Sequence, residues 1–273
     1  MLFTNRNVLI TGASRGIGKA IALRLAAEGA NIAVAAKTIE AHPRLEGTIH
    51  SAAEEIRQAG SSKVLACQTD IRNEADIAGL IEQTVRAFGG IDILINNASA
   101  IDLSTTETIP SKKLDLMHQI NVRGTFLVSQ ACIPYLKKSA NPHILNLSPP
   151  LNLVPKWFGK HLAYTMSKYG MSMVVMGLAE ELKKYPIAVN ALWPKTTIAT
   201  AAVRNLLGGE ALIQRSRKPS IVADAAFYIL QRPAANCSGN FFIDEDILRE
   251  NGIDNFDDYA VTPGVPLFPD LFL

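Results

Sequence analysis

The chain lacks several features that would place it in a particular class of protein. Its 273 residues include only three cysteines, Cys67, Cys132 and Cys237, an odd number without metal-ligand spacing. This argues against a disulfide framework and favours reduced thiols in a cytoplasmic protein. The acidic residues at 254, 257 and 258 lack the spacing of a calcium loop. We therefore expect no metal site.

Charge of one sign and long apolar runs are also missing. The 27 basic and 25 acidic residues give a net charge of +2, which is no electrostatic footprint for nucleic acid. Apolar runs end well short of the roughly 20 residues that a membrane span needs. The first residues run straight into an apolar strand and do not form a signal peptide. We expect a cytoplasmic protein that binds neither nucleic acid nor membranes.

What the chain does contain is a regular alternation of short apolar runs and helical patterns. The hydrophobic fraction of 48% suffices for one large core. Strands are expected at 7–10, 31–35, 64–70, 91–96, 143–147, 187–193 and 240–244. Helices are expected after the first strand and at 48–59, 74–88, 111–138, from 163 onward and at 220–231, with loops at 38–47 and 195–219. This alternation predicts an α/β fold: a single-domain, three-layer, doubly wound parallel sheet of the Rossmann type.

A glycine-rich segment separates the first strand from its helix. It reads Thr11-Gly12-Ala13-Ser14-Arg15-Gly16-Ile17-Gly18. Glycines at this point let the backbone approach a pyrophosphate, which binds at the helix N-terminus where amides point outward. We expect Gly12, Ser14, Arg15, Gly16, Ile17 and Gly18 to bind a dinucleotide.

The end of the second strand indicates which dinucleotide. An acidic residue at this place usually holds the adenosine ribose hydroxyls. Here the position is Ala36, and Lys37 follows. No carboxylate repels a 2′-phosphate, and both Lys37 and Arg15 offer charge-assisted hydrogen bonds to one, each contributing about 1.5–3 kcal/mol. We therefore expect NADP(H) as the cofactor.

A candidate proton donor lies on a later helix. Tyr164 and Lys168 are four residues apart, so they share one face of the helix. A nearby ammonium favours the phenolate, so we expect Lys168 to lower the pKa of Tyr164 and make it a usable acid or base.

Taken together, these residues resemble the short-chain dehydrogenase/reductase family over about residues 5–244. The resemblance rests on Thr11-Gly12-x-x-x-Gly16-x-Gly18, Asp70, Asn96-Asn97-Ala98, Asn121, Tyr164-x-x-x-Lys168 and Pro194, all in the family's order. Segments 35–38, 147–152 and 193–196 are similar to the hydroxysteroid-dehydrogenase-like subgroup. Members of that subgroup can carry a sterol-carrier domain, which we do not expect within this chain.

The resemblance implies a role for each matched residue. Tyr164 exchanges a proton with the substrate oxygen, Lys168 supports it and binds the nicotinamide ribose, and Asn121 holds a water that links Lys168 to solvent. Asp70 contacts the adenine, Asn97 and Ala98 line the adenosine side, and the backbone at Pro194 and Ile198 meets the nicotinamide. The resemblance further implies homodimers or homotetramers.

Three positions depart from the family's pattern. The Ser-Ser pair whose second serine polarises the carbonyl is replaced by Ser148-Pro149. Proline has no hydroxyl and no N–H, so either Ser148 takes that role or the donor is absent. Lys195 follows Pro194 in place of glycine, which suggests a cation at the mouth of the site. Ser99 replaces the glycine after Asn97 and Ala98, a mild change.

The interpretation that follows is a domain at 1–244 and an extension at 245–273. The apolar residues 267–273 are expected to pack over the substrate mouth or on another subunit.

We expect an oxidoreductase that interconverts a carbonyl and a secondary alcohol on a lipophilic small molecule. One alternative is a dinucleotide-binding sensor or scaffold with little turnover, as Pro149 suggests. Another is an enoyl reductase or epimerase with the same fold.

Overall fold

The fold is built on one parallel sheet. The structure is a computed structural model that describes residues 1–41, 46–61 and 63–273, so part of the expected loop 38–47 lies outside it. Within these ranges seven strands follow the order β3-β2-β1-β4-β5-β6-β7. They are β1 (Asn7–Thr11), β2 (Asn31–Ala36), β3 (Val64–Gln68), β4 (Ile93–Asn96), β5 (His143–Asn146), β6 (Ala188–Trp193) and β7 (Phe241–Ile243). The predicted doubly wound sheet is confirmed.

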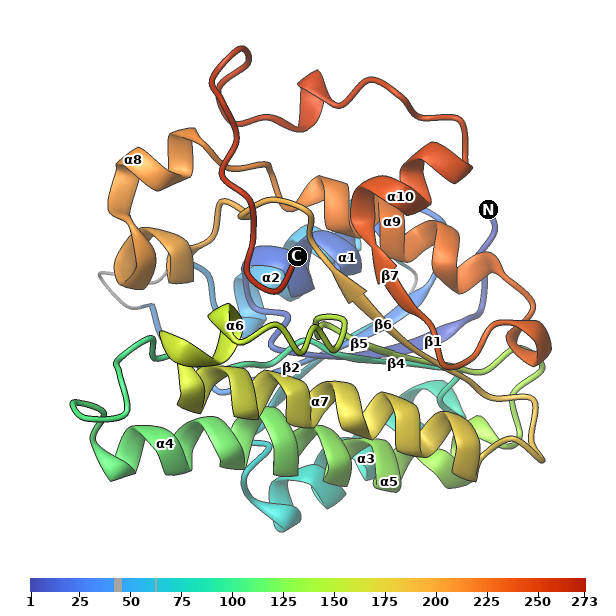
Figure 1. The fold of residues 1–273 in the computed structure, drawn as a ribbon. Helices are drawn as coiled ribbons and strands as arrows, with labels where there is room; N and C mark the ends of the chain where they lie inside the picture. Colours follow the sequence, from blue (N-terminus) through green and yellow to red (C-terminus); the bar gives the residue numbers. More distant parts are fainter. Residues whose placement is uncertain (42–45, 62) are drawn as a thin grey trace.

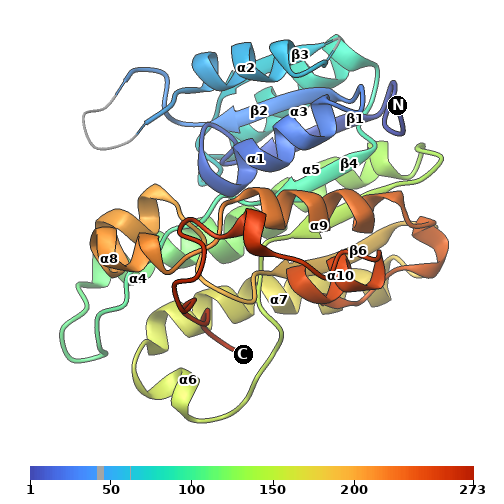
Figure 2. The same cartoon turned by 90° about the horizontal axis from the view of Figure 1, so that it is seen from above.

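Helices cover both faces of this sheet and make the fold three layers deep (Figures 1 and 2). One face carries α1 (Gly16–Ala26), α2 (Ile49–Gln58), α9 (Ser220–Gln231) and α10 (Asp244–Glu250). The other carries α3 (Glu74–Phe88), α4 (Ser111–Met117), α5 (Thr125–Leu136) and α7 (Leu162–Glu181). Two shorter helices, α6 (Lys156–Gly159) and α8 (Gly209–Gln214), belong to the loops after β5 and β6.

Each strand contributes side chains to two cores because successive residues point to opposite faces. In β1, Val8 and Ile10 pack in the core beneath α1 and α9, whereas Leu9 packs in the core shared with α5 and α7. All three side chains are fully buried. Burial on both faces explains why the strands are almost continuously apolar.

The topology opens a crevice at the carboxyl end of β1. This strand pairs with β2 on one side and β4 on the other, so the chain winds away from it in both directions. In doubly wound sheets ligands bind at this switch point. The glycine-rich segment lies there, between β1 and α1.

The expected helix 111–138 is not uniform. A π-helical segment, η1 (His118–Gly124), separates α4 from α5 and contains Asn121. Helix α7 crosses this segment closely, because Gly170 presents no side chain to it. A Cβ on Gly170 would lie 2.5 Å from Val122 Cγ2. This contact fixes the distance between Asn121 and the helix that carries Tyr164.

Substitution of Gly170 by alanine is therefore expected to destabilise the fold by about 1–3 kcal/mol through overpacking. Gly177, on the same helix, is the matched control, since nothing in the described ranges lies within 4 Å of a Cβ built there. Gly177→Ala should instead stabilise the fold by about 0.5–1 kcal/mol. Urea denaturation of both variants measures the difference, and equal effects of the same sign would contradict the close crossing.

The region after β7 contains a helix that the sequence analysis missed. Helix α10 starts directly after β7 with Asp244, Glu245 and Asp246 in its first turn and has Arg249 in its last. Acidic residues at the start and a basic one at the end suit the helix dipole. This pattern was visible in the sequence.

Three expected absences can be compared with the structure. No helix in the described ranges is both long and apolar enough to cross a membrane. Over the same residues, His, Cys, Asp and Glu side chains form no group that could hold a metal ion. The three cysteines are buried and are not joined in disulfides.

Candidate functional site

The glycine-rich segment forms a tight turn whose glycines are required by space. Gly12 and Gly16 have positive φ angles of 69° and 56°. A Cβ on Gly12 would lie 2.9 Å from Ala98 Cα, and one on Gly18 would lie 2.4 Å from Asn97 Nδ2. The turn therefore packs directly on the residues that follow β4. Side chains larger than hydrogen at these positions would push the two segments apart.

Asn97 fastens this turn. Its Nδ2 donates to the carbonyl oxygens of Thr11 (2.9 Å) and Gly12 (3.0 Å). In return, Thr11 Oγ1 accepts from the backbone N–H groups of Asn97 and Ala98, both at 3.1 Å. The first turn of α1 follows Arg15, whose side chain gives it no capping hydrogen bond within the described structure. Uncapped amides at a helix N-terminus suit an anionic ligand.

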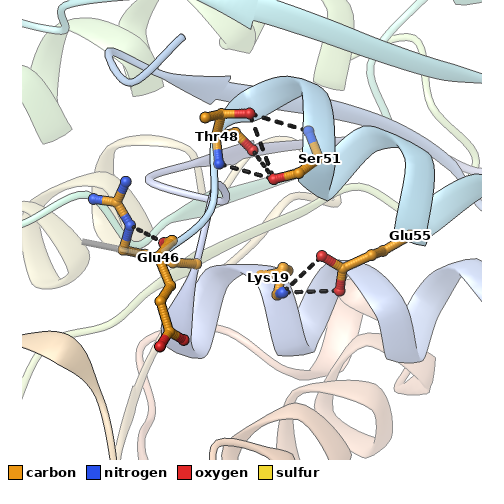
Figure 3. A network of polar contacts seen from close by, with 6 residues as sticks. Lys19, Glu46, Thr48, Ser51 and Glu55 are labelled. Carbon is orange, nitrogen blue, oxygen red and sulfur yellow. Dashed lines mark hydrogen bonds and ion pairs between the residues drawn. The ribbon is translucent and has the colours of Figure 1, made fainter. Parts of the chain in front are cut away.

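Helix α2 and the loop before it border the turn (Figure 3). The Thr48 side chain caps the helix by accepting from Ser51 N, and Lys19 of α1 pairs with Glu55 of α2 at 2.8 Å. The Lys19–Glu55 pair joins α2 to α1. The Arg15 guanidinium donates to the Glu46 and Gly47 carbonyl oxygens, at 2.9 and 2.7 Å.

A cluster of charges surrounds the ends of β2 and β3. Lys37 is more than half exposed, and its Nζ lies 3.6 Å from Asp70 Oδ2. Asp70 also binds the Arg72 guanidinium, which with that arginine's N–H lowers the pKa of Asp70 to about 2. Asp70 is therefore ionised. It pairs with both Lys37 and Arg72, and its contact with Lys37 holds that lysine near the cleft.

A cleft crosses the carboxyl ends of the strands and has two lobes. One lobe, of about 640 Å³, lies along β1, β2, β3 and β4 and is here called the adenosine lobe because residues expected to bind adenosine line it. The other lobe, of about 400 Å³, lies beside α7 and β6 and is here called the catalytic lobe because Tyr164 and Lys168, the expected catalytic residues, line it. Both are lined by Ile17, Asn97, Ser99, Ile101, Thr200 and Ala202. The expected residues Gly12, Ser14, Arg15, Gly16, Lys37, Asp70 and Ala98 line the adenosine lobe; Tyr164, Lys168, Pro194 and Ile198 line the catalytic lobe.

Helix α7 buries Tyr164 and Lys168 in the wall of the catalytic lobe. Their exposed fractions are 6% and 2%. Lys168 Nζ donates to the Leu147 carbonyl oxygen at 2.6 Å and lies 3.3 Å from Met171 Sδ. Burial lowers the pKa of Lys168 to about 7, while Asp270 raises it. The ammonium and the neutral amine are therefore both accessible near neutral pH.

The pKa of Tyr164 is not low in this structure, although a lowered value was expected from Lys168. Burial raises the pKa of Tyr164 above its ordinary value, and the Asp270 carboxylate raises it further. The physical reason is that an apolar wall disfavours the phenolate, while the lysine is directed at Leu147. Tyr164 therefore keeps its proton across the neutral range, which suits a proton donor.

Asn121 is fully buried, lines neither lobe, and connects the loop after β4 to α7. Its side chain accepts from Ala100 N and donates to Ala100 O, at 2.8 and 2.9 Å. It also donates to Ser167 Oγ at 3.0 Å, and that hydroxyl donates to the Tyr164 carbonyl oxygen. Asn121 thus joins the loop after β4 to the turn that carries the tyrosine.

The end of β5 brings no hydroxyl into the catalytic lobe. Ser148 is 0% exposed, and its Oγ has no hydrogen-bond partner in the part of the chain that the structure describes. Pro149 is also buried, and its carbonyl oxygen accepts from Ser172 Oγ at 2.6 Å. Neither residue lines the lobe, so Ser148 would have to turn to reach a substrate.

Lys195 does not lie at the mouth of the site, contrary to expectation. Its side chain is 47% exposed and lies 3.9 Å from Asp246 Oδ1. The lysine is absent from the residues that line the lobe, whereas Pro194 is among them. The backbone geometry after β6 therefore turns the cation outward.

The segment 266–272, here called the tail segment, supplies an outer wall of the catalytic lobe that the motifs did not indicate. It returns beside β6, where Thr197 N donates to Phe268 O (3.0 Å) and Asp270 N donates to Lys195 O (3.1 Å). Trp193 Nε1 donates to Leu271 O at 2.9 Å. Phe268, Pro269, Asp270 and Leu271 line the lobe.

Phe272 anchors the tail segment. It is 1% exposed, and its ring centroid lies 5.2 Å from that of Tyr169, 5.9 Å from Trp193 and 6.2 Å from Tyr164. The only signal for this packing was the apolar composition of residues 267–273.

Comparisons with known proteins find a family model and similar relatives. The family model described as short chain dehydrogenase matches residues 6–210. The chain is 61% identical over 266 residues to hydroxysteroid dehydrogenase-like protein 2 of Bos taurus and 60% identical to the Homo sapiens protein of that name. Each alignment covers 97% of this chain and 63% of the relative, so the chain spans less than two thirds of those proteins.

A solved structure is similar over the whole length. A short chain dehydrogenase from Mycobacterium thermoresistibile superposes with a TM-score of 0.94 at 50% identity, covering 100% of this chain and 96% of the other. The likeness includes the region of the tail segment.

Proposed function

Because the chain belongs to the short-chain dehydrogenase/reductase family and to its hydroxysteroid-dehydrogenase-like subgroup, we propose that it is an NADP(H)-dependent oxidoreductase that interconverts a carbonyl and a secondary alcohol. The observation that carries the proposal is the burial of Tyr164 and Lys168 on one wall of a lobe that continues into the glycine-lined cleft. The test is whether turnover of an undemanding dicarbonyl with NADPH requires Tyr164.

The residues of the cleft fit a nicotinamide dinucleotide. The Gly12 and Gly18 positions leave no room for a Cβ, and the uncapped amides of α1 face the space beside them. Those amides would hold the pyrophosphate, Arg15 and Lys37 the 2′-phosphate, Asp70 and Ala98 the adenosine, and Lys168 the nicotinamide ribose. The bound dinucleotide supplies or accepts the hydride.

Tyr164 carries out the proton transfer in this proposal. In the reducing direction its O–H bond breaks and the proton passes to the carbonyl oxygen, as the carbonyl carbon gains the hydride. The resulting phenolate is disfavoured by burial, so a charged Lys168 nearby lowers the cost of forming it. Solvent then returns a proton to the phenolate. Oxidation of the alcohol is the same sequence reversed.

The substrate class follows from the lining of the catalytic lobe. Most side chains there are apolar: Ile101, Leu103, Leu147, Trp193, Val203, Leu207, Leu212, Phe268 and Leu271. Such a lining favours a lipophilic small molecule. The steroid in the relatives' name is not part of the proposal.

The second candidate is a dinucleotide-binding sensor or scaffold with little turnover. It is favoured by one observation, the missing hydroxyl at the end of β5. An enoyl reductase or epimerase would use the same tyrosine and differ in substrate.

We also propose that the chain forms homodimers or homotetramers and works in the cytoplasm. Met166, Met173 and Met176 of α7 are 48%, 62% and 52% exposed, and Phe126 of α5 is 46% exposed. Large apolar side chains exposed on two helices of one face are typical of an interface.

The NADP(H) preference can be reversed at one position. Ala36→Asp places a carboxylate beside Lys37, where it repels a 2′-phosphate and can accept from ribose hydroxyls. We expect NADPH to bind about 10- to 100-fold more weakly, corresponding to about 1.4–2.8 kcal/mol, and NADH more tightly. Fluorescence titration with both cofactors measures the change.

Asn255→Asp adds the same charge on an exposed residue outside the cleft and keeps the oxygen that accepts from Asp257 N. It should leave both affinities unchanged. Weaker NADPH binding in this control, or unchanged preference in Ala36→Asp, would contradict the proposed 2′-phosphate site.

A further inference from the structure

The catalytic lobe contains a carboxyl group that the proposed reaction does not use. Asp270 lines the lobe together with Tyr164 and Lys168. Its backbone is fixed by the bond from Asp270 N to Lys195 O, and its Oδ1 accepts from Leu271 N at 2.7 Å. Its Oδ2 receives no hydrogen bond from the described residues. Oδ2 can therefore interact with other groups that line the lobe.

The surroundings make this carboxyl unusual. Asp270 lies deep among neighbouring atoms, but part of its surface stays accessible because it borders the cavity. Burial raises the pKa of Asp270 to about 7. Carboxyl groups are rarely placed in an apolar lobe without a charged partner.

Lys168 is the partner that the lobe offers. Within the described ranges, the lobe is lined by one lysine, Lys168, one histidine, His161, and one carboxyl group, Asp270. Lys168 and Asp270 are not in direct ion-pair contact within the described part of the chain, since Lys168 Nζ is held by Leu147 O. Their charges still interact across the lobe: Asp270 raises the pKa of Lys168, and Lys168 lowers that of Asp270.

Other charged groups near this pair do not replace Lys168 as the partner of Asp270. Asp244, at the start of α10, raises the pKa of Asp270, and its own Oδ1 is occupied by the N–H groups of Lys195 and Glu245. Arg217 pairs with Glu245 and lowers the pKa of Asp244. Tyr164 is uncharged near neutral pH, since burial and the Asp270 carboxylate both raise its pKa.

We propose that Asp270 is a positioning residue that keeps Lys168 charged, so that a carboxylate of the tail segment maintains the ammonium group beside Tyr164 during proton transfer. The catalytic meaning of this inference rests on the proposed oxidoreductase function. The charge relation itself does not, because it concerns two side chains of this chain.

The direct test is the titration of Lys168 in protein that carries isotope-labelled lysine, with the signal assigned by its loss in Lys168→Met. Asp270→Asn keeps the size of the side chain and removes its charge. We expect the pKa of Lys168 to fall by about one unit in this variant, a ten-fold change in the protonation equilibrium. An unchanged or raised pKa would overturn the proposal.

Asp246→Asn is the control, because Asp246 is a 59% exposed carboxylate near the same segment and does not line the lobe. It should leave the Lys168 titration as in the wild type. An equal shift in this control would also overturn the proposal, since general surface charge would then be the cause.

Kinetics separate this inference from the proposed function. In the wild type, kcat/KM for reduction should fall as pH rises through the Lys168 pKa. In Asp270→Asn this alkaline limb should start about one unit lower, leaving kcat/KM about ten-fold lower on that limb and near the wild-type value at acidic pH. An unmoved limb overturns the positioning role. No turnover in the wild type, with the titration shift present, overturns the proposed function instead.

Discussion

Replacing Tyr164 by phenylalanine is expected to lower kcat for carbonyl reduction by about 10²–10⁴-fold, the range that general acid catalysis contributes. The variant keeps the ring that packs against Phe272 and loses only the hydroxyl. Without that hydroxyl, no proton reaches the carbonyl oxygen from α7. The measurement is NADPH oxidation with a reactive, undemanding dicarbonyl, together with NADPH affinity to show that the cofactor still binds.

Tyr169→Phe provides the matched control on the same helix. Tyr169 OH donates to Asn152 O and does not line the catalytic lobe. Its loss should cost about 1 kcal/mol of stability and leave kcat nearly unchanged. Turnover that survives in Tyr164→Phe would mean that another group donates the proton. A wild type that binds NADPH but turns over no dicarbonyl would favour the sensor.

Lys168→Met is expected to separate activity from stability. The substitution preserves an unbranched side chain in the apolar wall and removes the charge that stabilises the phenolate. We expect turnover to fall on the order of 100-fold or more. At the same time, the variant no longer has to bury an ammonium, so its stability near neutral pH should equal or exceed that of the wild type.

The pH dependence gives this prediction its sign. Burial lowers the pKa of Lys168 from 10.5 to about 7 in the folded protein, so between these values the unfolded chain binds more protons. Wild-type stability due to this group therefore rises with pH, by up to ~1.4 kcal/mol per unit. Lys168→Met lacks this contribution, so the wild type should gain about 2 kcal/mol on the variant between about pH 7 and pH 9.

Urea denaturation of both proteins at each pH measures that difference, and groups that titrate equally in both cancel. Lys138→Met, at an exposed residue after α5, is the control and should follow the wild type at every pH. A constant difference between the wild type and Lys168→Met would show that the lysine is not held at a lowered pKa.

The fold could be predicted because its signals are local. Apolar runs of strand length, separated by amphipathic stretches, leave few arrangements other than a parallel sheet covered on both faces. The turn at Gly12 was equally predictable, because glycines between a strand and a helix are typical of a tight turn whose backbone can approach a pyrophosphate. The π segment at 118–124 was not, because it depends on how α7 crosses it at Gly170.

The electrostatics of the site could not be predicted because they depend on contacts between distant residues. Spacing along a helix placed Lys168 beside Tyr164. It could not show that the lysine donates to Leu147, or that Asp270, about a hundred residues later, lies in the same lobe. Ser148 is likewise excluded from the lobe by packing against neighbouring elements, and the residues next to it in the sequence do not reveal that packing.

The position of Phe272 has a consequence for how selectivity can change over time. The adenosine lobe belongs to the sheet and its first helices, whereas the outer wall of the catalytic lobe belongs to residues 266–272, joined by backbone bonds and one aromatic anchor. Apart from changes at Asp270, mutations in those few residues would reshape the space for substrate without changing any residue that lines the adenosine lobe. Cofactor specificity and substrate specificity can therefore change independently, because largely different residues determine them.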